Sequence, residues 1–560
     1  MGDTPVCTSD PADSGTRAGC AEHGGASQEP KAAKSQEGIV APDGSRLATT
    51  PPATRGGAPE EQRGAKRQHV PTLKDLKDRA KKRGKTAGAK EETMLQKSAP
   101  LLEWPYETQL AMKATYVKSA VRSFTKQVKR RAEDRAEDPP AWTTAEWSLA
   151  SGAPLGCGCP LGAPLGTPAE HLRGYRNKCE FTIGLTEAGE VEVGFVLRAL
   201  GDGAQLVAGC GDAPHVPAAM KRLCAELRGL VAASPFPVFD RRRGAQRGTW
   251  RLLMARLSPA GELLVLVQTA SLAEAERRRF EELLVPPLLA AGLGVVSVYL
   301  QFNDGVTDAA RPDAPLLHVH GQPCLRMPLL GLGFEIGPLS FFQANSAACA
   351  ALFETALRWL RPEGATVLDV CCGAGAIGLC AAGRCRRVVG VELVPEAVEA
   401  ARRNAALNGI ANASFHAGRA EDVLPALLAD LAPEEGEVVA VVDPPRAGLH
   451  ASVLAALRRC QRLARLVYVS CNPESLAEDV VRLCGPLETD PDPLVPVRAV
   501  AVDMFPHTLH CEMVLLLERA SRVPDPRAAD AAGEGAALGV GAADGGAGEA
   551  QAADVGGSAA

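Results

Sequence analysis

The sequence predicts an α/β protein in which a mixed α/β region precedes a doubly wound parallel sheet. From about Ser346 onward, strand-like runs alternate with glycine turns and helical segments, the order that parallel sheets produce. Between residues 175 and 340, four apolar or alternating runs are typical of strands, and one stretch is typical of a helix. With 560 residues and 46% hydrophobic side chains, the chain is long enough for two or three domains with sizeable cores.

Five segments follow one another along the chain. The spacing of apolar residues from about Leu101 to Arg131 predicts a basic amphipathic helix, which a Pro/Gly-rich stretch follows. The two ends are rich in Gly, Ala and charged residues, and such compositions cannot bury enough apolar surface to fold. We therefore expect a disordered leader that is basic towards its end (1–98), the helix and linker (99–170), a central mixed α/β domain (171–342), the doubly wound domain (343–520) and a disordered tail (521–560).

Basic residues cluster locally although the formal net charge is −5. The runs KKRGK at 81–85 and DRRRGAQR at 240–247 are candidates for contact with phosphate, because local patches govern that attraction more than net charge does. For 81–85, a solvated helix face or a nuclear-import signal is an equal alternative. The run at 240–247 lies between folded segments and is the better candidate for RNA contact.

Nothing in the sequence indicates secretion or a membrane span. The first residues have no apolar signal-peptide core, and no apolar run is long and uninterrupted enough to cross a bilayer. We expect a monomer without a membrane partner that is cytoplasmic, nuclear or both. The 17 cysteines are then expected to be reduced thiols. Cys157 and Cys159 lack a second pair at matching spacing, so no metal site is expected.

A glycine-rich turn marks a candidate cofactor site. The segment ATVLDVCCGAGAIGLCAA at 365–382 is a strand, a turn with Gly373, Gly375 and Gly378, and a helix, so the backbone can approach a ligand closely. The next strand ends in Glu392, which is placed to accept hydrogen bonds from a ribose diol. These features alone suit NAD as well as S-adenosylmethionine.

A second motif favours the methyl donor. The sequence DPPR begins with Asp443 at the end of a predicted buried strand, and it resembles the catalytic-loop motif of class I methyltransferases. Amino-group members of that class carry an aromatic residue where this chain has Arg446. We infer that the site is not built to stack the base of an exocyclic amine.

Cys471 lies where the strand LVYVS ends and an Asn-Pro break begins. Taken alone, it is better explained as one more small buried hydrophobe. Beside a methyl donor it acquires a use, because a thiolate that adds to C6 of uracil converts C5 into a carbon nucleophile. A base must then remove the C5 proton, and His507, His510 and Glu512 are the candidates near the last predicted strand.

Several separate motifs together resemble the RNA uracil-5-methyltransferases, from about Trp104 to Arg519. They are YRNKCEF at 175–181, FFQANS at 341–346, DPPR, SCNP and FPHTLHCE. The resemblance implies a class I SAM-dependent methyltransferase fold, a Rossmann-like doubly wound sheet, behind an RNA-binding domain. It implies that the T-loop uridine of tRNA becomes 5-methyluridine. Two departures stand out, since no RNP-like strand occurs in 1–98 and the cysteine spacing does not supply an iron-sulfur cluster.

The resemblance also implies individual roles. Cys471 is expected to be the nucleophile and Glu512 the proton acceptor. The expected S-adenosylmethionine-binding residues are Gln343, Glu392 and Asp443, with the backbone around Cys371 and Gly373. The expected RNA-binding residues are Tyr175, Arg176, Asn177 and Lys178.

Three other functions remain open from the sequence. The same chemistry could act on a ribosomal or mitochondrial RNA. The protein could act mainly as a tRNA-binding folding chaperone, with methylation incidental. A cytosine C5-methyltransferase uses related thiolate chemistry and ranks lower, because the order of motifs resembles the uracil family throughout.

Overall fold

The computed structural model describes residues 72–73, 75 and 93–531, apart from 202, 243–246, 312, 431–435, 487–489 and 491. Most of the predicted leader and tail, the basic run 81–85 and part of the run 240–247 therefore lie outside the described residues. Two short helices do lie inside stretches predicted to be disordered, namely α2 (Met94–Ser98) and α13 (Pro526–Ala531). Helix α2 begins at a capping box in which Thr93 and Gln96 satisfy each other's backbone N–H groups.

The central region is a mixed seven-stranded sheet with strand order β2-β3-β1-β4-β5-β6-β7. Its strands are β1 (Lys178–Leu185), β2 (Val191–Ala199), β3 (Gln205–Gly209), β4 (Trp250–Leu257), β5 (Leu263–Thr269), β6 (Val295–Phe302) and β7 (Leu316–Gly321). The helices α5 (Ala218–Ala233) and α6 (Glu274–Ala290) share one apolar core with these strands. A two-stranded hairpin, β8 (Leu325–Leu329) and β9 (Leu332–Ile336), leads out of this region.

The C-terminal sheet has the order β12-β11-β10-β13-β14-β16-β15. Neighbours among β10 to β14 are parallel, whereas β16 is antiparallel to both β14 and β15. The strands are β10 (Thr366–Val370), β11 (Arg387–Glu392), β12 (Ala413–Ala417), β13 (Val438–Val442), β14 (Leu463–Ser470), β15 (Leu494–Val502) and β16 (Glu512–Arg519). The predicted doubly wound domain is thus present, with an antiparallel pair added at one edge.

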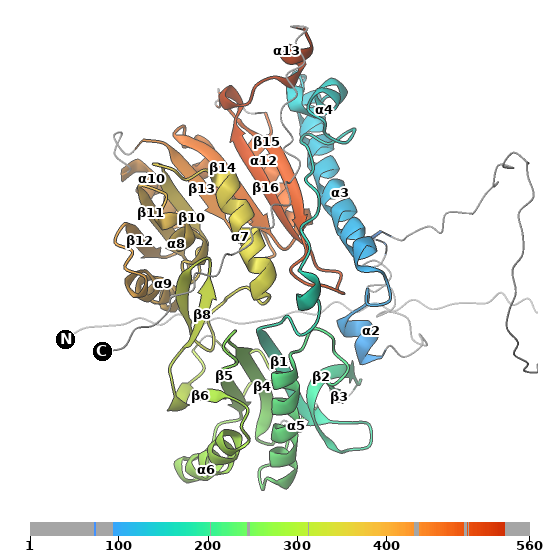
Figure 1. Ribbon diagram of the computed structural model, residues 1–560, viewed down its shortest axis with the longest axis vertical. Coiled ribbons are helices and arrows are strands. Elements are labelled where there is room, and N and C mark those ends of the chain that lie inside the picture. The colour runs from blue at the N-terminus through green and yellow to red at the C-terminus, as the bar shows by residue number, and fades with distance from the viewer. Residues whose placement is uncertain are drawn as a thin grey trace, which may run out of the picture. The chain divides into compact units, whose positions relative to one another are not determined.

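Helices cover both faces of this sheet (Figure 1). One face packs against α7 (Ser346–Leu360), α8 (Ala376–Ala382) and α9 (Pro395–Leu407). The other packs against α10 (Ala420–Asp430), α11 (Ala451–Arg459), α12 (Pro473–Cys484) and the long helix α3 (Tyr106–Glu133). The central strands β10, β13, β14 and β16 are almost wholly buried, which is why they are rich in Val, Ala and Leu.

Helix α3 is the predicted amphipathic helix, and it packs against the C-terminal sheet. Its apolar stripe, with Val117, Val121, Phe124 and Val128 fully or almost fully buried, belongs to the same core as β15 and α12. Figure 1 shows α3 beside β15 and β16, far along the chain. The linker after α3 holds α4 (Ala145–Ala150) and short 3-10 turns. Among the described residues, no helix is long and apolar enough to cross a membrane.

Candidate active site

The strand order reverses at β10, which lies between β11 and β13, and in open α/β sheets ligands bind beyond the carboxyl ends of the strands at such a point. The turn that follows β10 has three residues with positive φ: Cys371 at 64°, Gly373 at 55° and Gly375 at 79°. At Gly375 a side chain would press on Phe415, whereas a Cβ at Gly373 would meet no heavy atom within 4 Å. The turn is therefore packed against the protein at Gly375 and open at Gly373, so a ligand can approach its backbone closely there.

Glu392 closes one side of this turn. One of its carboxylate oxygens accepts the N–H of Gly373 at 3.0 Å, and the other accepts the N–H of Val394 at 2.9 Å. The carboxylate is thus fixed at the end of β11, beside the open turn. Each oxygen retains acceptor capacity for a ligand hydroxyl.

Asp443 follows β13 directly and faces Gln343 from the loop before α7. The Gln343 side-chain amide lies 3.5 Å from Asp443 Oδ2. Burial raises the pKa of Asp443 to about 7, although the contact with Gln343 favours the charged form. The sequence prediction that Gln343, Cys371, Gly373, Glu392 and Asp443 form one site stays a prediction, and the structure places all five at this edge of the sheet.

Cys471 and Glu512 lie opposite each other at the same edge. The antiparallel ladder between β14 and β16 ends with Ser470 paired with Met513. Cys471 is the next residue of the one strand and Glu512 the next residue of the other, so their backbones are cross-strand neighbours. Cys471 is half-buried, whereas Glu512 is 2% exposed.

Burial and nearby charges shift the pKa values of both groups. Burial, Glu512 and Asp443 raise the pKa of the Cys471 thiol, and Arg446 opposes them through its charge and a hydrogen bond. Burial and Asp443 raise the pKa of Glu512 to about 8, again opposed by Arg446. Arg446 is therefore the cation that makes both ionised forms accessible. Its presence in place of an aromatic residue has an electrostatic explanation.

The loops that carry Arg446 and Cys471 are tied together. The side-chain amide of Asn472 donates to the Arg446 carbonyl at 2.9 Å, and its oxygen accepts the Glu474 N–H at the start of α12. Asn472 therefore ends the strand, caps the helix and fixes the distance between the two motifs. This explains the Asn-Pro break that follows the cysteine.

The YRNK stretch runs antiparallel to the FFQANS stretch. Arg176 bridges Asn345, and the Asn177 amide donates to the Gln343 carbonyl at 2.8 Å and to the Ser346 hydroxyl at 2.9 Å. Tyr175 is 8% exposed, and its hydroxyl donates to the Pro506 carbonyl. Tyr175 and Asn177 thus hold the site together, while Arg176 and Lys178 keep exposed surface. RNA contact by these four residues stays a prediction.

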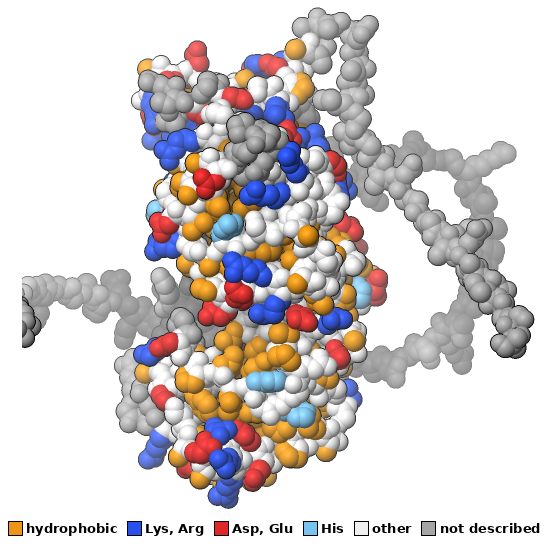
Figure 2. Space-filling model, turned by 90° about the vertical axis from the view of Figure 1, so that its left-hand side faces the viewer, with side chains coloured by type: hydrophobic (Ala, Val, Ile, Leu, Met, Phe, Trp, Pro, Cys, Tyr) orange, Lys and Arg blue, Asp and Glu red, His pale blue; other side chains and the backbone are white. Residues whose placement is uncertain are grey.

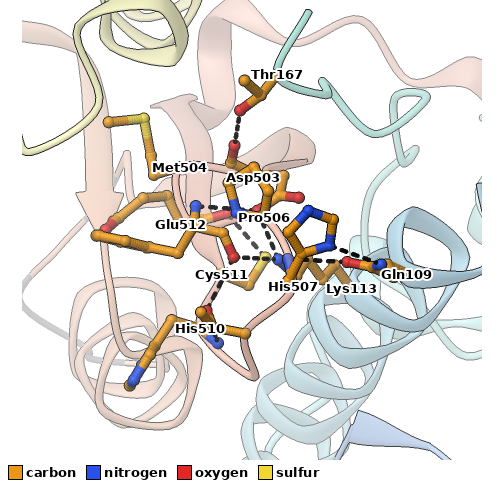
Figure 3. A network of polar contacts seen from close by, with 12 residues as sticks. Gln109, Lys113, Thr167, Asp503, Met504, Pro506, His507, His510, Cys511 and Glu512 are labelled. Carbon is orange, nitrogen blue, oxygen red and sulfur yellow. Dashed lines mark hydrogen bonds and ion pairs between the residues drawn. The ribbon is translucent and has the colours of Figure 1, made fainter. Parts of the chain in front are cut away.

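The two histidines differ in their surroundings. The His507 ring is buried against Gln109 of α3, and burial lowers its pKa (Figure 3). His510 is exposed, with its ring edge-on to Phe505. Of the three candidate bases, Glu512 alone occupies the strand position opposite Cys471.

Sequence reasoning missed two side chains. Asp369 lies inside β10, is 1% exposed, and accepts the Gly378 N–H at 2.8 Å; burial raises its pKa to about 7. Phe341, next to the buried Phe342, is 70% exposed beside the Gln343 loop. An acid within an apolar strand run was a signal for the first. Nothing in the FF pair distinguishes the exposed ring from the buried one.

The basic run at 240–247 contributes structure at its described end. Arg241 is 8% exposed and donates to Asp308 and to backbone carbonyls, and Arg242 pairs with Asp240. On the face shown in Figure 2, Lys and Arg side chains are interspersed with Asp and Glu. Cys157 and Cys159 are buried thiols, and no cluster of potential metal ligands occurs among the described residues.

The fold and the site define a Rossmann-like methyltransferase with a thiol and a carboxylate facing each other at the ligand edge. Residues 332–520 match the family model described as tRNA (Uracil-5-)-methyltransferase. The tRNA (uracil-5-)-methyltransferase homolog A of Mus musculus is 36% identical over 76% of this chain and 69% of its own length. The Homo sapiens homolog A is 37% identical over 75% of this chain and 66% of its own length.

A solved structure shares the fold. It is the Pyrococcus abyssi tRNA (uracil-54, C5)-methyltransferase in complex with S-adenosyl-L-homocysteine, with a TM-score of 0.52, 24% identity, and coverage of 74% of this chain and 84% of that chain. The chain belongs to the tRNA (uracil-5-)-methyltransferase family, and it is an enzyme.

Proposed function

We propose that this enzyme methylates C5 of the T-loop uridine of tRNA to give 5-methyluridine. The observation that carries the proposal is the cross-strand placement of Cys471 and Glu512 beside Asp443. The names of the mouse and human relatives support tRNA as the substrate, and the name of the archaeal enzyme, which specifies uracil-54, supports a defined uridine. The same chemistry on another structured RNA is the alternative that the experiment below separates.

The residues around the glycine turn fit S-adenosylmethionine. The open side of Gly373, the fixed carboxylate of Glu392, and the pair Gln343 and Asp443 supply close backbone approach and hydrogen-bond acceptors. When bound, S-adenosylmethionine supplies a methyl group on a positively charged sulfur. Buried acids suit that charge, because a nearby cation stabilises the ionised form of Asp443 and Asp369.

Cys471 begins the reaction. Its thiolate adds to C6 of the uracil ring, and the electron pair of the C5–C6 double bond moves to C5 and the C4 carbonyl. C5 then takes up the methyl group and becomes tetrahedral, carrying both methyl and hydrogen. Arg446 is placed to favour the thiolate, since it lowers the pKa that burial and Glu512 raise. Because its charge acts on both Cys471 and Glu512, it is also available to stabilise the negative charge that develops on the ring.

Glu512 completes the reaction. Its carboxylate removes the C5 proton, the electron pair re-forms the C5–C6 double bond, and the Cys471 thiolate leaves. The pKa of about 8 matches this task, because a base near the working pH combines an accessible ionised form with useful proton affinity. The products are 5-methyluridine and S-adenosylhomocysteine, and the enzyme is regenerated when Glu512 passes the proton to solvent.

The test is incubation of the purified full chain with labelled S-adenosylmethionine and unmodified tRNA, followed by nucleoside mass spectrometry and mapping. We expect 5-methyluridine in the T-loop with the wild-type protein and none with Cys471→Ala, which should also lose the covalent adduct with 5-fluorouridine RNA. Cys385→Ala, which removes another half-buried thiol, is the matched control and should retain both. Methylation at another position or in another RNA would show that the T-loop uridine is not the substrate and would leave the chemistry unchanged. An adduct that survives in Cys471→Ala would overturn the mechanism, and tight tRNA binding without product would favour the chaperone function.

A further inference from the structure

The loop 503–511 joins β15 to β16 and carries Glu512 at its far end. Val502, the last residue of β15, pairs with Glu512 in the antiparallel ladder. Oε2 of Glu512 has no hydrogen-bond partner among the described residues, although it is buried. No hydrogen bond to that oxygen therefore orients the Glu512 carboxylate. Its position depends on the backbone of the loop and strand that carry it.

Helix α3 holds the start of this loop through an ion pair and a hydrogen bond to Asp503 (Figure 3). Lys113 Nζ lies 2.5 Å from Asp503 Oδ1, and both side chains have no exposed surface. The same Nζ donates to the Phe505 carbonyl at 3.0 Å. The other oxygen, Oδ2, accepts the Tyr106 hydroxyl at 3.0 Å, and the Phe505 N–H donates to Oδ1. One lysine and one tyrosine of α3 thus satisfy both carboxylate oxygens.

Helix α3 also holds the middle of the loop, through hydrogen bonds between Gln109 and His507. The Gln109 side-chain oxygen accepts the His507 N–H at 2.9 Å, and its amide nitrogen donates to the Trp104 carbonyl and contacts His507 Nδ1 at 3.1 Å. Because an amide nitrogen only donates, Nδ1 accepts, and the imidazole proton lies on Nε2. His507 has a φ of 66°, a conformation that a non-glycine residue holds only where its surroundings impose it.

Other segments complete the enclosure of the loop. The Thr167 hydroxyl donates to the Asp503 carbonyl at 2.8 Å, and the Asn345 amide donates to the Met504 carbonyl at 3.1 Å. Tyr175 reaches the Pro506 carbonyl. These three contacts reach only backbone carbonyls of the loop. Helix α3, in contrast, contacts Asp503, the one acid in positions 503–511, and His507, the one residue there with a left-handed backbone.

We propose that Lys113 and Gln109 are positioning residues for the base Glu512, acting through Asp503 and His507. The inference rests on the proposed function and adds that α3 serves the proton-removal step. Cys471 directly follows β14, and its loop is tied to Arg446 through Asn472. Helix α3 reaches that side of the site through Tyr116, whose hydroxyl donates to Glu474 of α12, and not through Lys113 or Gln109. Removing the contacts of Lys113 and Gln109 with the loop 503–511 should therefore slow the resolution of the methylated adduct and leave its formation largely intact.

The experiment uses the full-length protein with uridine-containing tRNA and separates the two steps by single-turnover kinetics. Lys113→Met and Gln109→Met should form the covalent RNA adduct within about threefold of the wild-type rate but resolve it about 10- to 100-fold more slowly, so that the adduct accumulates. Lys113→Met leaves Asp503 as an unpaired buried charge and can impair folding. Tyr106→Phe, which removes one hydroxyl, is the milder variant and should show the same bias to a smaller degree.

The matched control is Arg458→Met. Arg458 pairs with Asp490 at 2.5 Å in another nearly buried ion pair, near the start of β15 rather than its end. Arg458→Met should lower the melting temperature about as much as Lys113→Met. Unlike Lys113→Met, it should not accumulate adduct. If formation and resolution slow equally in the α3 variants, or if the control accumulates adduct as they do, the positioning role is overturned. If the wild-type protein forms no adduct on any RNA, the proposed function itself fails, whatever the variants do.

Discussion

Asp503 and Glu512 flank one loop, yet their carboxylates have opposite surroundings. Asp503 is neutralised by Lys113 and accepts further hydrogen bonds from Tyr106 and Phe505. Glu512 is equally buried, has an oxygen without a partner among the described residues, and has a pKa of about 8. Asp503, whose two oxygens are both hydrogen-bonded, fixes the loop. Glu512, which has an oxygen without a partner among the described residues, keeps the proton affinity that a base requires.

Replacing Glu512 with Gln should trap the reaction after methyl transfer. The amide cannot accept the C5 proton, so the Cys471 adduct forms and persists. Denaturing gels of a reaction with labelled tRNA should show an RNA-protein band that grows with time. If Glu512→Gln turns over at the wild-type rate, the base must be another group, and His507→Ala and His510→Ala become the next variants.

The same substitution should stabilise the folded protein in a pH-dependent way. Because the pKa of Glu512 is raised to about 8, its stabilising contribution is complete below the unfolded pKa of about 4.3 and is lost as pH rises through 8. The gain from Glu512→Gln should therefore grow between pH 5 and pH 8, by at most about 1.4 kcal/mol per pH unit. Urea unfolding at several pH values measures it. Glu478→Gln, at an exposed position of α12, should show no such trend.

Removing the Arg446 charge should shift the pH dependence of catalysis towards alkaline values. Arg446 lowers the pKa values of both Cys471 and Glu512, and turnover needs both groups deprotonated. In Arg446→Met the rising limb of kcat/KM against pH should move up by about half a unit, a modest shift because Arg446 is solvent-exposed. Arg446→Lys keeps the charge and should move it less. Equal shifts in both variants would show that the charge is not the cause.

The exposed ring of Phe341 should matter for RNA and not for folding. It lies two residues before Gln343 with 70% of its surface exposed, so it is available to stack on an unpaired base. Phe341→Ala should reduce kcat/KM about 5- to 150-fold, as expected for the loss of about 1–3 kcal/mol of stacking, with an unchanged melting temperature. Leu339→Ala, which truncates a neighbouring exposed side chain, is the control and should have a smaller effect. Equal effects would indicate general loss of apolar surface.

Local patterns predicted the glycine turn, DPPR and the thiol, because strands and turns leave short-range signals. The antiparallel ladder that places Glu512 opposite Cys471 could not be predicted that way, since the pairing joins residues on separate strands. Nor could the burial of Tyr175 and Asn177, whose residue types suit RNA contact and hydrogen-bonded packing equally. The amphipathic stripe of α3 predicted a helix, but nothing in it named the sheet on which it packs.

The pairing of Lys113 with Asp503 spans 390 residues of sequence. At about 5–20 residues per second, a ribosome needs roughly 20–80 s between the two codons. Throughout that interval the apolar stripe of α3 has no sheet edge to cover, and its lysine has no counter-ion. The nascent chain therefore holds an unfinished domain while the whole central sheet is made within it. Newly synthesised protein should depend on chaperones, and truncations that remove the last two strands should aggregate rather than yield a smaller folded enzyme.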